Sequence, residues 1–257
     1  MTGPAPLVEA PAPSDAEAIV ALLREGFDPP VLELALYGCP GVERFVAEHL
    51  RMGELSPYRY RVIRGRGGLL GVAEFRLREA TLFLNYVAVS PAARGAGAGN
   101  ALLRSMVAEA RALGLAELAL DVFTFNAGPL AWYERLGLRA QGERSFFVGA
   151  PRPDEAAPPF RVPDLPQADA VHARFGFSEL TLERPGRSLR VGRLGAGFFR
   201  LAGLRDATDA ALHACLRRLD PGRRLVAAVE GGPPAPPGWE PRGVSRRMGV
   251  ALEEVRL

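Results

Sequence analysis

Residues 85–100 of this 257-residue chain have the sequence NYVAVSPAARGAGAGN. The alternating apolar residues up to Val89 are typical of a β-strand. Ser90 and Pro91 end that strand, and three glycines lead into the helical pattern of Asn100–Leu113. A glycine-rich turn at a helix N-terminus exposes backbone N–H groups, and the helix dipole makes them attractive to phosphate. The stretch therefore predicts a phosphate-binding turn.

The glycine spacing distinguishes two classes of phosphate-binding turn. Gly95 and Gly97 fit the first part of the dinucleotide-binding pattern GxGxxG, but Asn100 stands where that pattern needs its third glycine. Such a turn also usually opens a βαβ unit early in its domain, whereas this turn follows three predicted strands. The sequence context therefore argues against a Rossmann dinucleotide fold.

The residues before the turn predict two helices and an antiparallel sheet. Ser14 and Glu17 fit a capping box that begins an amphipathic helix, and Asp28-Pro29-Pro30 ends it. Gly41–Met52 is a second amphipathic helix. After Pro57 the hydrophobic period changes to two, which indicates strands joined by short turns and therefore an antiparallel meander. The three predicted strands are Tyr58–Arg64, Leu69–Leu77 and Leu82–Val89.

The residues after the turn predict alternating helices and strands. The strand Glu117–Phe123 follows the helix Asn100–Leu113, so this strand and the last strand of the meander are expected to be parallel. Asn126 and Pro129 open a further helix at Leu130–Leu136. A strand at about Leu138–Val148 completes the unit.

Two motifs resemble those of a known family. The pattern Arg94-x-x-Gly97-x-Gly99 after Val89-Ser90-Pro91 resembles motif A of the Gcn5-related N-acetyltransferases (GNAT), a large acetyl-CoA-dependent family. Downstream, Asn126, Tyr133 and Gly137 are similar to the family's N-x-x-A-x-x-x-Y-x-x-x-G-F pattern, with Pro129 and Leu138 as mild departures. The two motifs cover residues 82–140, and the order of helices and strands extends the resemblance over residues 7–148.

The resemblance implies an α/β (α+β) fold of the acyl-CoA N-acyltransferase type, with a mixed, mostly antiparallel central sheet and flanking helices. It implies that acetyl-CoA is the cosubstrate and lies between two parallel strands that splay apart. In the family, amides of the turn hold the CoA diphosphate and the preceding strand pairs with the pantetheine arm. The cofactor-binding residues implied are Val87, Ala88, Val89, Arg94, Gly95, Ala96, Gly97, Ala98, Gly99, Asn100 and Asn126.

The resemblance also implies two catalytic residues for attack of a primary amine on the thioester in a ternary complex. Tyr133 is the candidate general acid. Its rate enhancement is expected to lie at most in the lower part of the usual ~10²–10⁴-fold range, because a thiolate already leaves well. Asp121 is the candidate general base, since a Glu stands at this position in the ribosomal-protein amino-terminal acetyltransferases of the family. Glu74 and Glu79 are the alternatives. The acceptor, a small molecule or a peptide amine, is not defined by the sequence.

Six prolines between Pro151 and Pro166 interrupt the composition, and such a run is expected to hold neither a helix nor a central strand. We therefore predict an acetyltransferase domain at 1–149, a linker at 150–168 and a second domain at 169–257. The second domain repeats the order of the first, which indicates duplication. Its predicted strands are Phe177–Glu183, Ser188–Leu194, Phe198–Leu204, Arg223–Glu230 and Gly243–Leu252, with a helix at Ala207–Leu219.

The second domain is expected to be a smaller, degenerate copy. Its turn, Arg205–Thr208, has lost the glycines, so we expect it to bind no CoA and to close the acceptor pocket or pack as an intramolecular pseudo-dimer. A homodimer is the alternative assembly.

The composition excludes several classes of function. The chain has 32 basic and 29 acidic residues and contains no lysine, which excludes a Schiff base and a Walker-type P-loop. It has no arginine-rich run with interleaved aromatic residues, so we expect no nucleic-acid partner. Cys39, Cys215 and three histidines show no metal-ligand spacing, so we expect no metal.

The sequence contains no run of ~18 apolar residues and no leader pattern, so we expect a cytoplasmic protein without a membrane partner. An acetyltransferase is the leading hypothesis for this chain. A catalytically silent acyl-CoA-binding or regulatory protein is the alternative.

Overall fold

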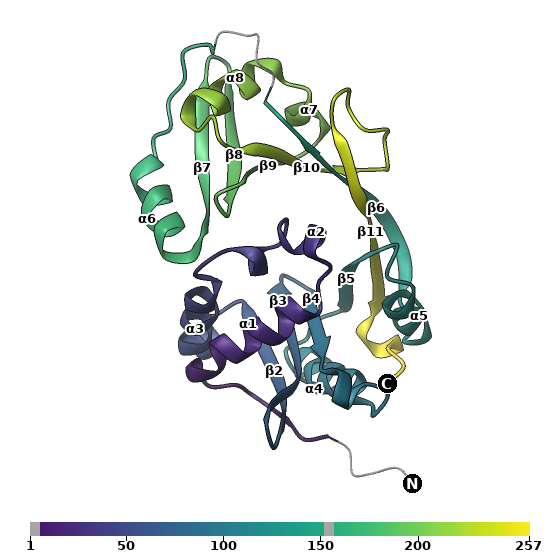
Figure 1. Cartoon of the computed structure of the whole chain (residues 1–257). Coiled ribbons are helices and arrows are strands. Elements are labelled where there is room, and N and C mark those ends of the chain that lie inside the picture. Colours follow the sequence, from purple (N-terminus) through teal and green to yellow (C-terminus); the bar gives the residue numbers. More distant parts are fainter. Residues whose placement is uncertain (1–5, 152–156) are drawn as a thin grey trace. The chain divides into compact units, whose positions relative to one another are not determined.

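A computed structural model describes residues 6–151 and 157–257 of the chain (Figure 1). These residues form two compact units. The first unit consists of the described residues up to Asp28, Glu43–Gly142 and Arg246–Leu257. The second consists of Pro29–Val42 and the described residues of Glu143–Ser245. Each unit thus includes a segment from the part of the sequence that we assigned to the other domain, and the division at 149 and 169 stays a prediction.

The first unit contains a mixed, mostly antiparallel sheet. Neighbouring strands from β1 to β4 pair antiparallel, whereas β4 and β5 pair parallel, as the intervening helix predicts. The three strands of the predicted meander therefore form, each within about one residue of its expected bounds. In spatial order the strands are β1 (Val8–Glu9), β2 (Tyr58–Gly65), β3 (Gly68–Arg78), β4 (Thr81–Val89), β5 (Glu117–Phe123) and the last part of β11 (Glu240–Ala251).

Helices pack on both faces of this sheet. The helix α1 (Ala16–Glu25) packs on β3 and β4, and α4 (Ala98–Ala112) packs on β2, β3 and β4 from the other face (Figure 1). The two faces are distinguished by adjacent strand residues: a Cβ at Gly26 would touch Ala88, and a Cβ at Gly71 would touch Leu102 of α4. Three elements complete the unit: α3 (Val42–Met52), α5 (Ala127–Arg135) and the first part of β6 (Arg139–Gly149).

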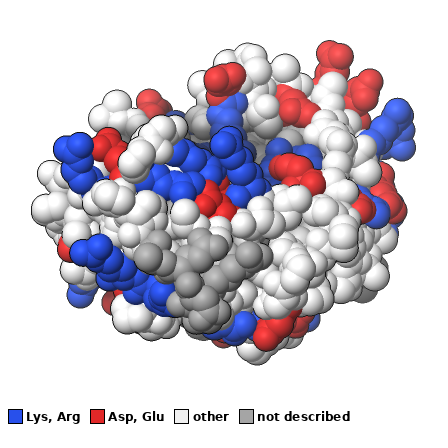
Figure 2. Space-filling model, turned by 90° about the horizontal axis from the view of Figure 1, so that it is seen from above, with Lys and Arg blue, Asp and Glu red and all other residues white. Residues whose placement is uncertain are grey.

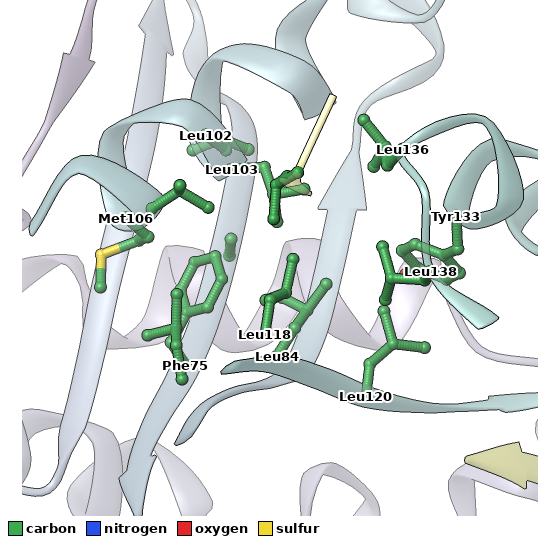
Figure 3. Packing of buried hydrophobic residues seen from close by; sticks show 14 of the residues in the cluster. Phe75, Leu84, Leu102, Leu103, Met106, Leu118, Leu120, Tyr133, Leu136 and Leu138 are labelled. Carbon is green, nitrogen blue, oxygen red and sulfur yellow. The ribbon is translucent and has the colours of Figure 1, made fainter. Parts of the chain in front are cut away.

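A large apolar cluster joins the sheet of the first unit to α4 and α5 (Figure 3). Fully burying a side chain of this size contributes about 1.5–3 kcal/mol, so the cluster fixes both helices against the strands. Tyr133 lies beside Leu138 in this cluster (Figure 3). The labelled members are Phe75, Leu84, Leu102, Leu103, Met106, Leu118, Leu120, Tyr133, Leu136 and Leu138.

The second unit repeats the order of elements of the first, as predicted. The strands β7 (Phe177–Arg184), β8 (Arg187–Leu194) and β9 (Phe198–Leu201) form an antiparallel meander. β10 (Arg224–Glu230) pairs parallel with β9 and antiparallel with the second part of β6. The helices of this unit are α2 (Pro29–Leu32), α6 (Leu165–Phe175), α7 (Leu204–Ala207) and α8 (Ala210–Leu219).

One predicted helix start was placed wrongly, and one helix that begins inside the proline run was not predicted. A 3-10 turn at Pro13–Asp15 precedes α1, and the Asp15 carboxylate accepts a hydrogen bond from the Ala12 N–H at 2.7 Å, so Asp15 rather than Ser14 supplies the capping contact. α6 begins at Leu165, inside the proline run, because Pro166 stands in the first helical turn, where a missing N–H is harmless. The residues 152–156 of that run lie outside the described part.

The predicted helix Ala207–Leu219 is divided into α7 and α8. The Thr208 hydroxyl donates to the carbonyl of Leu204 at 3.0 Å, and the Asp209 carboxylate caps α8 by accepting from the Leu212 N–H at 2.9 Å. Ser, Thr and Asp side chains favour such helix ends over helix interiors. This division also shortens the preceding strand, which ends at Leu201 rather than Leu204.

Candidate functional site

The parallel strands β4 and β5 pair over only part of their length. Their paired residues run from Thr81 opposite Glu117 to Leu84 opposite Leu120, although β4 continues to Val89 and β5 to Phe123. Along the same stretch β4 keeps its pairing with β3, up to Val89. Residues Val87–Val89 therefore have one edge in the sheet, while their other edge is paired with no described strand. A free strand edge can accept an extended chain by backbone hydrogen bonds.

A β-bulge lies where the two strands part. Glu74 of β3 is opposite Tyr86, but the next residue, Phe75, is opposite Leu84, so Asn85 is the extra residue of β4. A bulge bends its strand and increases the local twist. The bend begins at the position where pairing with β5 stops, and it accounts for the free edge of β4.

The predicted phosphate-binding turn leads from β4 to α4. Gly95 and Gly97 have φ angles of 76° and 80°, a conformation that glycine adopts without cost, and Gly97 is the N-cap of α4. A Cβ at either glycine would meet no atom within 4 Å. The first N–H groups of α4 follow directly and have no partner inside the helix. The turn therefore has open space over Gly95 and Gly97, where a ligand can approach the backbone.

Two residues of the motif are packed against α5. A Cβ at Gly99 would lie 3.1 Å from the Trp132 ring, and the indole N–H of Trp132 donates to the Asn100 side-chain oxygen at 2.7 Å. The Asn100 side-chain oxygen thus binds within the protein, which leaves the backbone N–H of Asn100 for the predicted contact with CoA. Trp132 is a positioning residue that the sequence analysis did not single out. The glycine two residues after Gly97 was the available signal, since it makes room for a large ring.

Arg94 and Asn126 flank the turn and the free edge. The Arg94 side chain is exposed, and its Nε donates to the carbonyl of Val89 at 3.2 Å. Asn126 stands at the N-cap position of α5, but its side chain makes no capping hydrogen bond. The Asn126 side-chain amide therefore does not cap the start of α5. It is available for the contact with CoA that the family resemblance implies.

Tyr133 is buried on α5. Its ring packs against Trp132 with 4.8 Å between ring centroids, and it belongs to the apolar cluster that includes Leu120 and Leu138. Burial raises the pKa of the Tyr133 hydroxyl well above its usual range. The hydroxyl therefore stays protonated at all physiological pH values, although the raised pKa also makes it a weaker proton donor.

The three candidate bases differ in their surroundings. Asp121 accepts two hydrogen bonds from Arg247 of β11, at 2.6 and 3.0 Å, and its side chain is 31% exposed. Glu74 is buried, and one of its oxygens accepts from the Asn85 amide at 2.7 Å. Glu79 is exposed in the turn between β3 and β4, with a φ of 35°. Glu74 is therefore fixed at the bulge itself, and Asp121 lies one residue beyond the last paired residue of β5.

The register places Glu74 and Tyr86 on the face of the sheet opposite α4. Directly paired residues of antiparallel strands share a face, and Tyr86 lies 5.4 Å from the Phe27 ring that follows α1. Tyr133 and the turn lie on the α4 side. The site thus has a proton donor on one side of the strand opening and carboxylates on the other.

The corresponding turn of the second unit is filled by its own side chains. One oxygen of Asp209 caps α8, and the other accepts from Arg187 at 2.5 Å and from Arg184. Asp206 binds Arg187 as well. Figure 2 views the end of the molecule where the β7–β8 hairpin lies in Figure 1, and it shows arginine side chains gathered around acidic ones. A carboxylate thus lies where the first unit leaves its helix N-terminus open.

The comparison with known proteins supports the reading of these motifs. Residues 34–138 match the family model for the acetyltransferase (GNAT) family. These residues belong to the GNAT acetyltransferase family. The match includes the strand opening, the glycine turn and most of the candidate site, so the family resemblance of the sequence is confirmed.

Curated relatives match the chain over about a third of its length. Human N-acetyltransferase 8B is 34% identical over 86 residues, which are 34% of this chain and 38% of that protein. The [ribosomal protein bS18]-alanine N-acetyltransferase of Escherichia coli (strain K12) is 38% identical over 84 residues, which are 32% of this chain and 55% of that protein. The chain thus spans about a third to a half of the length of the curated relatives it matches.

A solved structure extends the likeness to the whole chain. A tandem GNAT protein from the clavulanic acid biosynthesis pathway is similar over 96% of this chain and 98% of its own, with a TM-score of 0.64 and 15% identity. At this identity the likeness shows the fold alone. The predicted fold class and the tandem arrangement of two acetyltransferase-like units are confirmed.

Other side chains and helices add the following findings. In the described ranges, no group of three or more His, Cys, Asp or Glu side chains is placed to hold a metal ion. Cys39 and Cys215 are buried and form no disulfide. None of the described helices has the length and apolar character needed to cross a membrane.

Proposed function

We propose that the first unit transfers the acetyl group of acetyl-CoA to a primary amine, by direct attack of the amine in a ternary complex. The observation that carries this proposal is the early end of β4–β5 pairing beside an open, glycine-rich helix N-terminus. Both features lie within the residues that match the GNAT family model. The acceptor is a small molecule or a peptide amine.

The residues of the turn and of β4 fit the donor. The N–H groups between Gly95 and Asn100 that have no backbone partner, with the dipole of α4 behind them, would bind the diphosphate, and Arg94 would add a charge-assisted contact. The free edge of Val87–Val89 would pair with the amide groups of the pantetheine arm, as an added strand does. A backbone N–H of the same edge would polarise the thioester carbonyl, and the Asn126 amide would contact the arm.

Acetyl-CoA supplies an activated acyl group, and the chain's residues would move two protons. A carboxylate, Asp121 or alternatively Glu74, would take the proton that the amine must lose when its nitrogen bonds to the carbonyl carbon. Tyr133 would donate its hydroxyl proton to the sulfur as the carbon–sulfur bond breaks. Since the raised pKa of Tyr133 keeps the hydroxyl protonated, the donor is in the required state before each turnover.

We further propose that the second unit binds no CoA. The carboxylate of Asp209 occupies the N-terminus of α8, and a diphosphate there would have to displace it from Arg184 and Arg187. The expected stoichiometry is therefore one CoA for each chain.

Two measurements test the proposed function. Titration calorimetry with CoA should give a single site, and thiol release from acetyl-CoA should depend on an added amine in a panel of amino acids, peptides and polyamines. Because the chain has two free cysteines, a thiol reagent needs a blank with protein and no acetyl-CoA. Tight CoA binding with no turnover on any amine would favour the alternative, a catalytically silent acyl-CoA-binding or regulatory protein. Absence of CoA binding would overturn both.

A further inference from the structure

Three arginines gather on the face of the first unit's sheet that lies opposite α4. The guanidinium carbon of Arg78 lies 4.0 Å from the centre of the Phe83 ring, and that of Arg247 lies 4.9 Å from it. Arg76, two residues before Arg78 on the same strand, lies 5.4 Å from the ring of Tyr58. Arg76 is paired directly with Phe83 in the β3–β4 register, so the three arginines share one face. We refer to Arg76, Arg78 and Arg247 as the arginine cluster.

The arginine cluster has an excess of positive charge. Asp121 binds Arg247 through both of its oxygens, whereas neither Arg76 nor Arg78 has an ion-pair partner within the described parts of the chain. Partial burial, and then the charges of Arg76 and Arg247, lower the pKa of Arg78, and Asp121 offsets only part of this effect. The repulsion between these arginines is unfavourable while no anion is bound. An anionic ligand that binds beside them would relieve this repulsion, so such a cluster indicates an anion-binding site.

The guanidinium groups are accessible although the ring below them is not. Arg76 and Arg78 are exposed and the Arg247 side chain is 33% exposed, whereas Phe83 is only 6% exposed. Stacking on the aromatic ring restricts the guanidinium groups before a ligand arrives, which reduces the entropy lost on binding. Planar guanidinium groups bind carboxylate and phosphate groups through paired hydrogen bonds.

The arginine cluster lies where the two strands part. Phe83 comes one residue before the last paired residue of β4, and Asp121 comes one residue after the last paired residue of β5. A donor bound from the α4 side would present its carbonyl in this opening, so an acceptor must approach from the opposite face, which carries the arginines. Phe83 and Val87 are four strand residues apart, or about 13 Å. Because the guanidinium groups of Arg78 and Arg247 lie over Phe83, an acceptor has to span a comparable distance between its anionic group and its amine.

We propose that the acceptor is an extended anionic amine: a molecule that carries a carboxylate or phosphate at the far end of an extended chain from the primary amine it presents for acetylation. This proposal rests on the proposed function. The anionic group binds Arg76 and Arg78, while Asp121 keeps Arg247 in place. The amine then points from the arginine cluster toward the strand opening.

Pairs of acceptors that differ in one charge test the proposal. A tetrapeptide with a free carboxyl end is compared with its amide, and the same peptide amide with phosphoserine at its last position is compared with its serine form. We expect kcat/KM to be at least about tenfold higher for the charged member of one or both pairs, mainly through KM. The two pairs also distinguish a carboxylate from a phosphate. Equal kcat/KM within both pairs would overturn the proposal.

Variants assign the preference to the arginine cluster. Arg78→Gln and Arg76→Gln should reduce kcat/KM for the charged acceptors about tenfold or more and leave the neutral acceptors and the CoA dissociation constant unchanged. Arg104→Gln, an exposed position of α4 on the other face, is the matched control and should change none of these. If the cluster only covers Phe83, the Gln variants will lower thermal stability and affect charged and neutral acceptors alike, which would refute the proposal.

A binding measurement separates this proposal from the proposed function. The charged and neutral acceptors are titrated into the CoA-bound protein, where no acetyl group is available. Selective binding of the charged acceptor that Arg78→Gln removes, without turnover of acetyl-CoA, would support the anion site and contradict the enzymatic function. Turnover of acetyl-CoA without selectivity for the charged acceptor would support the enzymatic function and contradict the anion site.

Discussion

Gly97 offers a direct test of the proposed diphosphate site. Gly97→Asp adds a carboxylate at the N-cap of α4, in the place where Asp209 caps α8 of the second unit. The new side chain has room, because a Cβ at Gly97 meets no atom within 4 Å. Gly97→Asn is the matched control, because Asn has nearly the same shape, tolerates a positive φ as well as Asp, and carries no charge.

The expected effect follows from the charge that would face the diphosphate. A carboxylate about 5 Å from one phosphate charge, at an effective dielectric constant of about 20, is repelled by about 3 kcal/mol. Water at the open turn screens part of this energy, so we expect a loss of about 2–3 kcal/mol, or about a 30- to 150-fold higher dissociation constant for CoA. Gly97→Asn should raise the constant less than about tenfold.

Calorimetry of CoA binding at two salt concentrations measures this difference. The gap between the two variants should narrow as salt rises, because the repulsion between exposed charges is screened. Thermal unfolding of both variants should agree within a few degrees, since Asp and Asn are both good N-caps. If Asp and Asn weaken CoA binding equally, or if neither does, the diphosphate does not bind over Gly97 and the proposed donor site is wrong.

Three further substitutions address the chemistry and its support. Tyr133→Phe should lower kcat about 10- to 100-fold with little change in CoA affinity, measured by thiol release and calorimetry, and a large rise in the dissociation constant would mean that the hydroxyl is structural. Asp121→Asn and Glu74→Gln should differ in their effect on kcat. Replacing the residue that acts as general base should lower kcat about 10²–10⁴-fold at unchanged CoA affinity. Equal small effects on kcat would exclude both residues as the general base. Trp132→Phe removes the 2.7 Å hydrogen bond to Asn100 and should weaken CoA binding severalfold, and unchanged affinity would show that the bond does not position the turn.

The local elements of the first unit could be predicted from sequence because their signals are local. The period of two between Tyr58 and Val89 and the period of 3.6 after Gly97 each extend over enough residues to be unambiguous. The glycines of the turn were equally informative, since two of them adopt the positive φ that glycine allows. The parallel pairing of β4 and β5 then followed from the helix between them.

Contacts between distant residues could not be predicted from a single sequence. Arg247 binds Asp121 across 126 positions, and Trp132 binds Asn100 across 32. Neither pair has a local pattern that reveals it, because hydrophobic period and turn chemistry describe only neighbours along the chain. For the same reason the sequence did not show that residues 246–257 belong to the first unit.

The two units meet the same physical requirement in opposite ways. The first N–H groups of a helix need an acceptor, and the positive end of the helix dipole favours a negative charge. In the second unit Asp209 provides both, and Arg184 and Arg187 hold it there. In the first unit the equivalent N-cap is Gly97, which has no side chain, so the acceptor comes from water or from a ligand. The absence of a side chain at the N-terminus of α4, and the presence of one at the N-terminus of α8, thus separate the unit that is open to an anion from the unit that is not.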